Sequence, residues 1–182
     1  MSTIYAIGHS TRPLDKFIEL LKAHGITILA DIRTIPRSRR NPQFSQESLR
    51  EALPKMGIRY VHLKELGGLR HPAKDSMNKG WRNPSFRGYA DYMQTSKFVH
   101  ALRELMSLSK GERVAVMCAE GNPFRCHRSL VADALTARGV HVRHITSLSG
   151  TREHSMTPFA HVERTRVTYP EVQAKHSGKE SS

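Results

Sequence analysis

The chain alternates between short apolar runs and longer stretches in which apolar residues recur every three to four positions. The apolar runs predict five strands, at 4–7, 26–32, 58–62, 113–117 and 140–145. Helical spacing predicts four helices, at 13–24, 45–56, 88–108 and 130–137. Runs that are apolar throughout are typical of strands buried on both faces, and strands that alternate with helices predict a parallel sheet.

This alternation predicts an α/β fold with three layers, in which helices cover both faces of a doubly wound, mainly parallel five-stranded sheet. Numbered in chain order, the strands are expected in the order 3-2-1-4-5, with right-handed crossovers. The first strand then lies beside the fourth. The segments that follow these strands, Gly8–Ser10 and Cys118–Glu120, are therefore expected side by side. Open α/β sheets bind ligands at such a point, where the strand order reverses.

The periodic pattern fills residues 1–150, which we expect to form a single domain. Residues 151–182 lack it and are expected to be an irregular arm with a polar, disordered end from Gln173 onward. No apolar run approaches the length that spans a membrane, and the N-terminus lacks the pattern of a secretory signal. We therefore expect a cytoplasmic protein with no membrane partner. Nothing in the sequence indicates an oligomeric state.

The charge balance indicates an anionic partner. The 182 residues contain 29 Lys and Arg against 16 Asp and Glu, a formal net charge of +13. Such an excess favours nucleic acid or a phosphorylated small molecule as partner. Much of the excess follows the second, third and fourth strands, whose carboxyl ends share one edge of a parallel sheet. A basic rim with aromatic residues for base stacking is therefore predicted, comprising Arg37, Arg70, Trp81, Arg87 and Tyr89. The alternative is a loop that folds onto its own aromatic side chains.

The central stretch, Val114–Ser129, combines a strand, a tight turn and the start of a helix. Free backbone N–H groups at a helix N-terminus favour an anion, and nearby arginines strengthen that preference. The alternative is an ordinary exposed first turn. The residues expected to bind an anion or phosphate, here and at the ends of the first two strands, are His9, Ser10, Arg33, Arg125, Arg128 and Ser129.

Four residues are candidates for catalysis. Asp31 and Glu120 follow strands and could act as general bases, although structural ion pairs with arginines are an equal alternative. His127 could transfer a proton. Cys118 is either a thiolate nucleophile or a small apolar residue at a buried strand end, where free cysteines commonly lie.

Known motifs do not settle the role of Cys118. A tyrosine-phosphatase-like loop requires Arg where Phe124 stands, and a rhodanese-like loop requires Arg where Pro123 stands. Cys118 and Cys126 are separated by seven residues, more than in common zinc sites. We therefore predict neither a metal nor a cofactor.

Five motifs in order resemble those of the domain-of-unknown-function 488 family. The motifs are Ile7–Thr11, Asp31–Pro36, Leu66–Gly68, Phe86–Met93 and Cys118–Arg128. The resemblance implies a small bacterial, cytoplasmic α/β domain in which these motifs converge on one pocket. It implies no particular activity.

Together these features favour an enzyme that acts on a nucleotide or nucleic acid, for example by hydrolysing a glycosidic or phosphate bond. Two alternatives remain open. One is a non-catalytic nucleic-acid-binding module that uses the same basic rim. The other is a cysteine-dependent, sulfurtransferase-like enzyme that uses Cys118.

Overall fold

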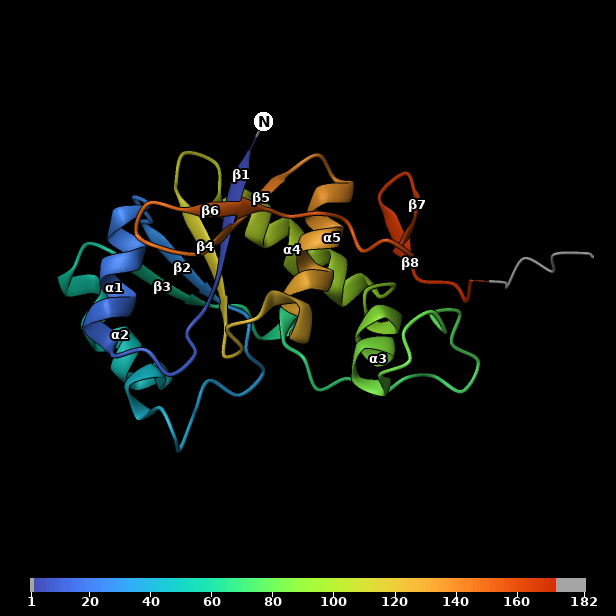
Figure 1. Cartoon of the computed structure of the whole chain (residues 1–182), viewed down its shortest axis with the longest axis horizontal. Coiled ribbons are helices and arrows are strands. Elements are labelled where there is room, and N and C mark those ends of the chain that lie inside the picture. The colour runs from blue at the N-terminus through green and yellow to red at the C-terminus, as the bar shows by residue number, and fades with distance from the viewer. Residues whose placement is uncertain (1, 173–182) are drawn as a thin grey trace, which may run out of the picture.

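The computed structural model of the protein describes residues 2–172, and its centre is a twisted six-stranded sheet (Figure 1). The strand order is β3-β2-β4-β1-β5-β6. The first five strands are parallel, and β6 pairs antiparallel with β5. The strands are β1 Thr3–Gly8, β2 Ile28–Asp31, β3 Arg59–His62, β4 Val114–Cys118, β5 His141–Ile145 and β6 Thr151–Glu153. The predicted α/β class with a mainly parallel sheet is confirmed.

Helices cover both faces of the sheet, as a doubly wound fold requires. Figure 1 shows α1 and α2 on one side, with α4 and α5 on the other. Each side has its own apolar core, one around Phe17 and Leu49 and one around Leu102 and Leu130. The helices are α1 Leu14–Ala23, α2 Gln46–Lys55, α3 Pro84–Tyr92, α4 Ser96–Leu108 and α5 Arg128–Ala137. Three single-turn 3-10 helices are η1 Pro42–Phe44, η2 Lys64–Leu66 and η3 Pro123–Arg125.

The strand order differs from the predicted one at a single exchange. β4 lies between β2 and β1, so β2 does not pair with β1, while β1 pairs with β4 and β5. The predicted neighbours β1 and β4 are confirmed. Both orders place these two strands side by side, and the local apolar pattern of each strand is the same in both. All five residues of β4 are buried, which suits a strand with neighbours on both edges.

The segment after residue 150, expected to be irregular, contains regular structure. β6 extends the sheet, which therefore has six strands instead of five. A separate antiparallel hairpin forms from β7, His161–Glu163, and β8, Arg166–Thr168. These strands have three residues each, too short for an alternating pattern to stand out in the sequence. The predicted disordered end, from Gln173, lies outside the described residues.

The single helix predicted at 88–108 is two helices. α3 ends at Tyr92, and Thr95 starts α4 by accepting a hydrogen bond from the Phe98 backbone N–H at 3.3 Å. Apolar residues at helical spacing continue through both helices, because both pack against the same core. The pattern alone therefore does not reveal the turn between them.

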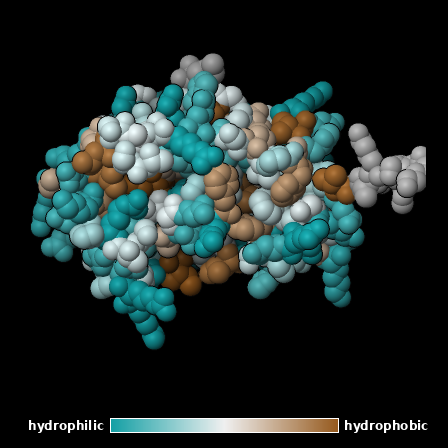
Figure 2. Space-filling model, viewed as in Figure 1, coloured by the Kyte–Doolittle hydropathy of each residue, from teal (hydrophilic) through white to brown (hydrophobic). Residues whose placement is uncertain are grey.

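On the face shown in Figure 2, hydrophilic side chains cover most of the surface and the hydrophobic patches between them are small. Within residues 2–172, no helix combines the length and apolar character needed to cross a lipid bilayer.

Candidate functional site

The carboxyl ends of β1 and β4 lie side by side, as the sequence predicts. The pairing of the two strands continues beyond their ends, where the His9 and Ser10 backbone N–H groups donate to the carbonyls of Cys118 and Ala119 at 2.9 and 3.0 Å. Gly8 permits this approach, since a Cβ at that position would lie 1.9 Å from the Glu120 carbonyl oxygen. Any larger residue would force the two segments apart.

A pocket of about 280 Å³ opens beside these strand ends. Segments that follow β2, η2 and β4 form its walls, together with the residues just before α5. The pocket therefore brings together predicted site residues from distant parts of the chain. Those that line it are Arg33, Arg37, Cys118, Glu120 and His127, with Cys126 beside them.

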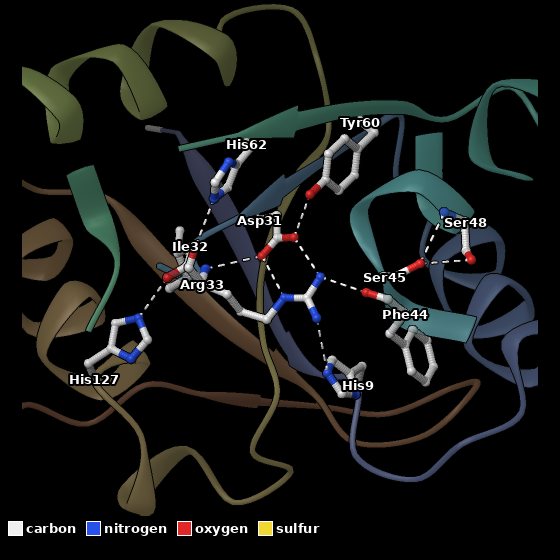
Figure 3. A network of polar contacts seen from close by, with 10 residues as sticks. All are labelled: His9, Asp31, Ile32, Arg33, Phe44, Ser45, Ser48, Tyr60, His62 and His127. Atoms are coloured by element: carbon white, nitrogen blue, oxygen red, sulfur yellow. Dashed lines mark hydrogen bonds and ion pairs between the residues drawn. The ribbon is translucent and has the colours of Figure 1, made fainter. Parts of the chain in front are cut away.

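Asp31 and Arg33 form a buried ion pair at the edge of this pocket, which Arg33 lines (Figure 3). Asp31 is fully buried and accepts bonds from Arg33 Nε at 2.9 Å and Nη2 at 2.7 Å, and from the Tyr60 hydroxyl at 2.5 Å. Burial and the Asp31 carboxylate raise the pKa of Tyr60, which keeps its proton. These bonds make Asp31 a structural residue, because proton abstraction would require breaking the ion pair.

His9 is buried next to the ion pair and stacks on Phe44, with 4.3 Å between the ring centroids (Figure 3). Its Nδ1 lies 2.7 Å from the Ser10 carbonyl oxygen. Burial lowers the pKa of His9, and the Arg33 charge lowers it further. His9 is therefore a neutral packing residue, and neither it nor Ser10 lines the pocket.

His127 is held in one orientation by the carboxyl end of β2. Its Nε2 lies 2.8 Å from the Ile32 carbonyl oxygen, which can only accept, so Nε2 carries the proton (Figure 3). Nδ1 is then a free acceptor, 3.4 Å from Cys126 Sγ. Burial lowers the pKa of His127 to about 4. The ring is therefore neutral near pH 7 and presents an unprotonated nitrogen to the pocket.

Arg128 is the first residue of α5, and only 2% of it is exposed. Its Nη1 lies 3.4 Å from Cys118 Sγ, and its Nη2 donates to the Gly121 carbonyl at 3.2 Å. Among residues 2–172, no carboxylate forms an ion pair with it. A buried guanidinium is costly without an anion beside it. The ionisable group that Arg128 contacts is the Cys118 thiol.

The N-terminus of α5 also points at sulfur. The Arg128 backbone N–H donates to Cys126 Sγ at 3.4 Å, while those of Ser129 and Leu130 donate to the carbonyls of Cys126 and His127. The Ser129 hydroxyl is buried and donates to the Cys126 carbonyl at 3.0 Å. The first three backbone N–H groups of α5 are therefore bonded to groups of the chain itself. Arg125 is exposed outside this arrangement.

The two thiols differ in acidity. Burial raises the pKa of Cys118. A hydrogen bond from the Cys126 thiol, the Arg128 charge and the Glu120 backbone lower this pKa by more than burial raises it, so the net shift is downward. The hydrogen bond to Cys118 and burial both raise the pKa of Cys126. Cys118 is therefore the more acidic thiol of the pair, and Cys126 keeps its proton.

Most of the predicted rim has a structural role. Tyr89 is 1% exposed and donates to the Leu66 carbonyl at 2.7 Å, so its ring is not available to a base. Trp81 packs against Phe86, Phe159 and Tyr169. This is the alternative considered above, a loop folded onto its own aromatics.

Two of the three arginines in the predicted rim also have structural contacts. Arg87 donates to the Trp81 carbonyl at 3.0 Å, and the Arg70 guanidinium lies 3.7 Å from the centre of the Tyr92 ring. Both therefore help to hold the long loop between β3 and α3. Arg37 is different, because it is exposed and lines the pocket.

Sequence analysis assigned no role to Cys126, which the structure places in the pocket beside Cys118. The available signal was that both cysteines of the chain fall in the central stretch. In the part of the chain described, no three His, Cys, Asp or Glu side chains are grouped so that they could hold a metal ion.

Comparison with known proteins identifies a family but no close relative. No curated protein matches the chain, and no solved structure does. Residues 13–135 match the family described as Domain of unknown function DUF488. This segment contains β2, β3, β4 and most of α5, and it includes every residue that lines the pocket, from Arg33 to His127. Because the match covers more than half of the chain, the protein belongs to the DUF488 family.

Proposed function

We propose that the protein is an enzyme whose nucleophile is the Cys118 thiolate and whose substrate is an anion held in the adjoining pocket. The observation that carries this proposal is Arg128, a buried guanidinium that contacts the Cys118 sulfur and has no carboxylate partner in residues 2–172. A thiolate satisfies the guanidinium and supplies a nucleophile at the same time.

The surrounding residues suit this chemistry better than hydrolysis by a carboxylate pair. Asp31 is closed off by Arg33 and Tyr60, which leaves Glu120 as the exposed carboxylate that lines the pocket. Glu120 is placed to exchange a proton with a leaving group. Arg37 is exposed and lines the same pocket, where it attracts an anionic substrate.

The test is the pH dependence of alkylation by iodoacetamide, with the modified residue located by mass spectrometry. The groups facing Cys118 are Arg128, Cys126 and Glu120, and their net effect lowers its pKa. Because the thiolate then persists to lower pH, labelling should be half-maximal below the value of about 8.5 for a free thiol.

Two variants complete this test. Arg128→Lys keeps the charge but loses the fixed contact, and should move the midpoint upward. Arg125→Lys makes the same exchange at an exposed site and should leave the midpoint unchanged. A Cys118 that labels no faster than a model thiol across this pH range would overturn the proposal.

A second candidate function is nucleic-acid binding, supported by the exposed arginines Arg37, Arg39 and Arg40 in a segment with no acidic residue between Arg33 and Phe44. Labelled DNA and RNA oligonucleotides should then bind with an affinity that falls steeply with salt. Replacing Arg37 and Arg39 by Gln should reduce the slope of log K against log salt by about 0.9 for each lost phosphate contact. As a control, replacing Lys16 and Lys55 by Gln removes the same charge elsewhere and should leave this slope unchanged. No binding at low salt would exclude this function.

A further inference from the structure

We infer that Cys126 is a second catalytic thiol that resolves a covalent intermediate on Cys118, and that the substrate class is a small anionic disulfide. This inference rests on the proposed role of Cys118 as nucleophile. It goes further because it assigns the bond that is broken, the final state of the enzyme and a role for His127.

The geometry brings both sulfurs to one arginine. Arg128 contacts Cys118 Sγ through Nη1 and Cys126 Sγ through its backbone N–H, each at 3.4 Å. Cys118 ends β4, and Cys126 lies just before α5, so the 3-10 helix η3 and its flanking turn fold the second thiol back toward the first. Both cysteines line the same pocket and are free thiols, and both are buried, with Cys118 1% and Cys126 7% exposed.

His127 supplies a base for the second thiol. Its Nε2–H is committed to the Ile32 carbonyl, so the unprotonated Nδ1 is available 3.4 Å from Cys126 Sγ. Gly68 keeps this nitrogen accessible, since a Cβ at that position would lie 3.2 Å from it. Cys126 therefore has a proton acceptor of its own, separate from the group that activates Cys118.

The shared arginine also sets the order of events. While Cys118 is a thiolate, its charge and its hydrogen bond raise the pKa of Cys126, so the second thiol stays protonated. Once Cys118 forms a covalent bond, both effects disappear. The Arg128 charge, which lowers the pKa of Cys126, then has no other anion to neutralise. Cys126 becomes nucleophilic only after Cys118 has reacted.

The two steps balance as follows. The Cys118 thiolate attacks a disulfide R–S–S–R′, forming Cys118–S–S–R and releasing R′–S⁻. Cys126 gives its proton to His127 Nδ1, and its sulfur attacks Cys118 Sγ to form the Cys118–Cys126 disulfide. The leaving group R–S⁻ takes the proton and departs as R–SH. The substrate gains two electrons and the two thiols lose them, so an external thiol must reduce the enzyme before the next cycle.

The pocket indicates which disulfides fit. Arg37 supplies positive charge, and the exposed apolar side chains of Ile35 and Leu69 line the same pocket. An aromatic disulfide with carboxylates matches both features. 5,5′-Dithiobis(2-nitrobenzoate) has this structure, and each of its thiolates is coloured when released.

The experiment mixes the reduced full-length protein with one molar equivalent of this reagent. Resolution by Cys126 predicts two coloured thiolates per protein and a product two hydrogens lighter than the starting protein, with no adduct. Cys126→Ser should release one thiolate and keep a stable adduct on Cys118. His127→Gln should slow the second release relative to the first by roughly 10²-fold, a typical contribution of a general base.

The outcomes separate the two proposals. If the wild-type protein keeps the adduct on Cys118 and releases one thiolate, the resolving role of Cys126 is overturned while Cys118 remains the nucleophile. If Cys118 in Cys126→Ser reacts no faster than a model thiol, the proposed function itself fails. In the wild-type protein quenched early with acid, the first adduct should lie on Cys118, located by mass spectrometry. A first adduct on Cys126 would reverse the order of the two thiols.

Discussion

At the scale of single residues, the two buried arginines at the site differ in the groups that they contact. Arg33 is 6% exposed and is neutralised by Asp31 through two hydrogen bonds. Arg128 is equally inaccessible but contacts thiols. The same side chain is therefore half of an ion pair at one position and a neighbour of two thiols at the other.

The ion pair at the edge of the pocket yields a stability prediction. Asp31→Asn should lower the free energy of unfolding by about 3 to 5 kcal/mol, because it leaves the Arg33 charge buried without a counter-ion. The exposed pair of Glu51 and Lys55 provides the control, and Glu51→Gln should cost less than about 1 kcal/mol. Urea unfolding measures both. Equal effects at the two sites would show that the buried pair is not a structural support.

At the scale of elements, α3 anchors the long loop that precedes it. Asp91 near the end of α3 accepts hydrogen bonds from the Ala73 backbone and from the side chains of Ser76 and Asn78. The loop, which holds Gly68 beside His127, is therefore held by a carboxylate of α3. A turn then separates α3 from α4.

Thr95→Ala tests this junction. It removes the side-chain cap of α4 and should lower the free energy of unfolding by about 1 kcal/mol. Thr95→Ser keeps the hydroxyl and should restore most of that stability. Thermal or urea unfolding gives the comparison, and Cys118 labelling should be unchanged in both variants. A Ser variant as unstable as the Ala variant would mean that the cap contributes nothing.

At the scale of the whole molecule, the segment after residue 150 is part of the core. Tyr169 is fully buried and donates to Asp133 of α5 at 2.7 Å. Asp133 also accepts from Thr157 at 2.6 Å and pairs with His154 at 2.8 Å. One buried carboxylate thus fastens this segment against the helix whose N-terminus carries Arg128. Residues beyond the first 150 therefore stabilise the site from behind.

Tyr169→Ala should lower the free energy of unfolding by about 3 to 5 kcal/mol, the usual cost of deleting a large buried ring. Val172→Ala truncates a neighbouring side chain that is 73% exposed and should change stability by less than about 0.5 kcal/mol. Equal and small effects in urea unfolding would show that this segment is not needed for the core.

Acid should also destabilise the whole molecule through its neutral histidines. Burial lowers the pKa of His127 to about 4 and that of His144 to about 3. Their unfolded values near 6.5 are higher, so the unfolded chain binds more protons as pH falls. The stabilisation is complete above pH 6.5 and is lost below it. Between pH 7 and pH 5, each of these two histidines should lower the free energy of unfolding by roughly 1 to 2 kcal/mol.

Urea unfolding at several pH values checks this slope. His127→Gln removes one of these two histidines and should reduce the pH dependence of the free energy of unfolding. His100→Gln replaces an exposed histidine of α4 and should leave that pH dependence unchanged. A pH-independent stability between 7 and 5 would contradict the neutral state of these two histidines.

The sequence by itself determined the α/β class, most strands and helices, and the meeting of β1 with β4. These follow from hydrophobic periodicity, which is a local property that each element carries in its own residues. The sequence also marked the central stretch, because Cys118, Glu120, His127 and Arg128 lie close together along the chain. Pocket residues from this stretch were therefore predictable.

Only the tertiary structure decided what these residues do. Whether Asp31 is a base or half of an ion pair depends on Tyr60, which is 29 positions away in the sequence. Whether Arg128 binds a phosphate or a thiolate depends on which groups are buried beside it, and the position of β4 between β2 and β1 depends on the packing of both cores. Burial and charge pairing join segments that are distant along the chain, so no local pattern records them.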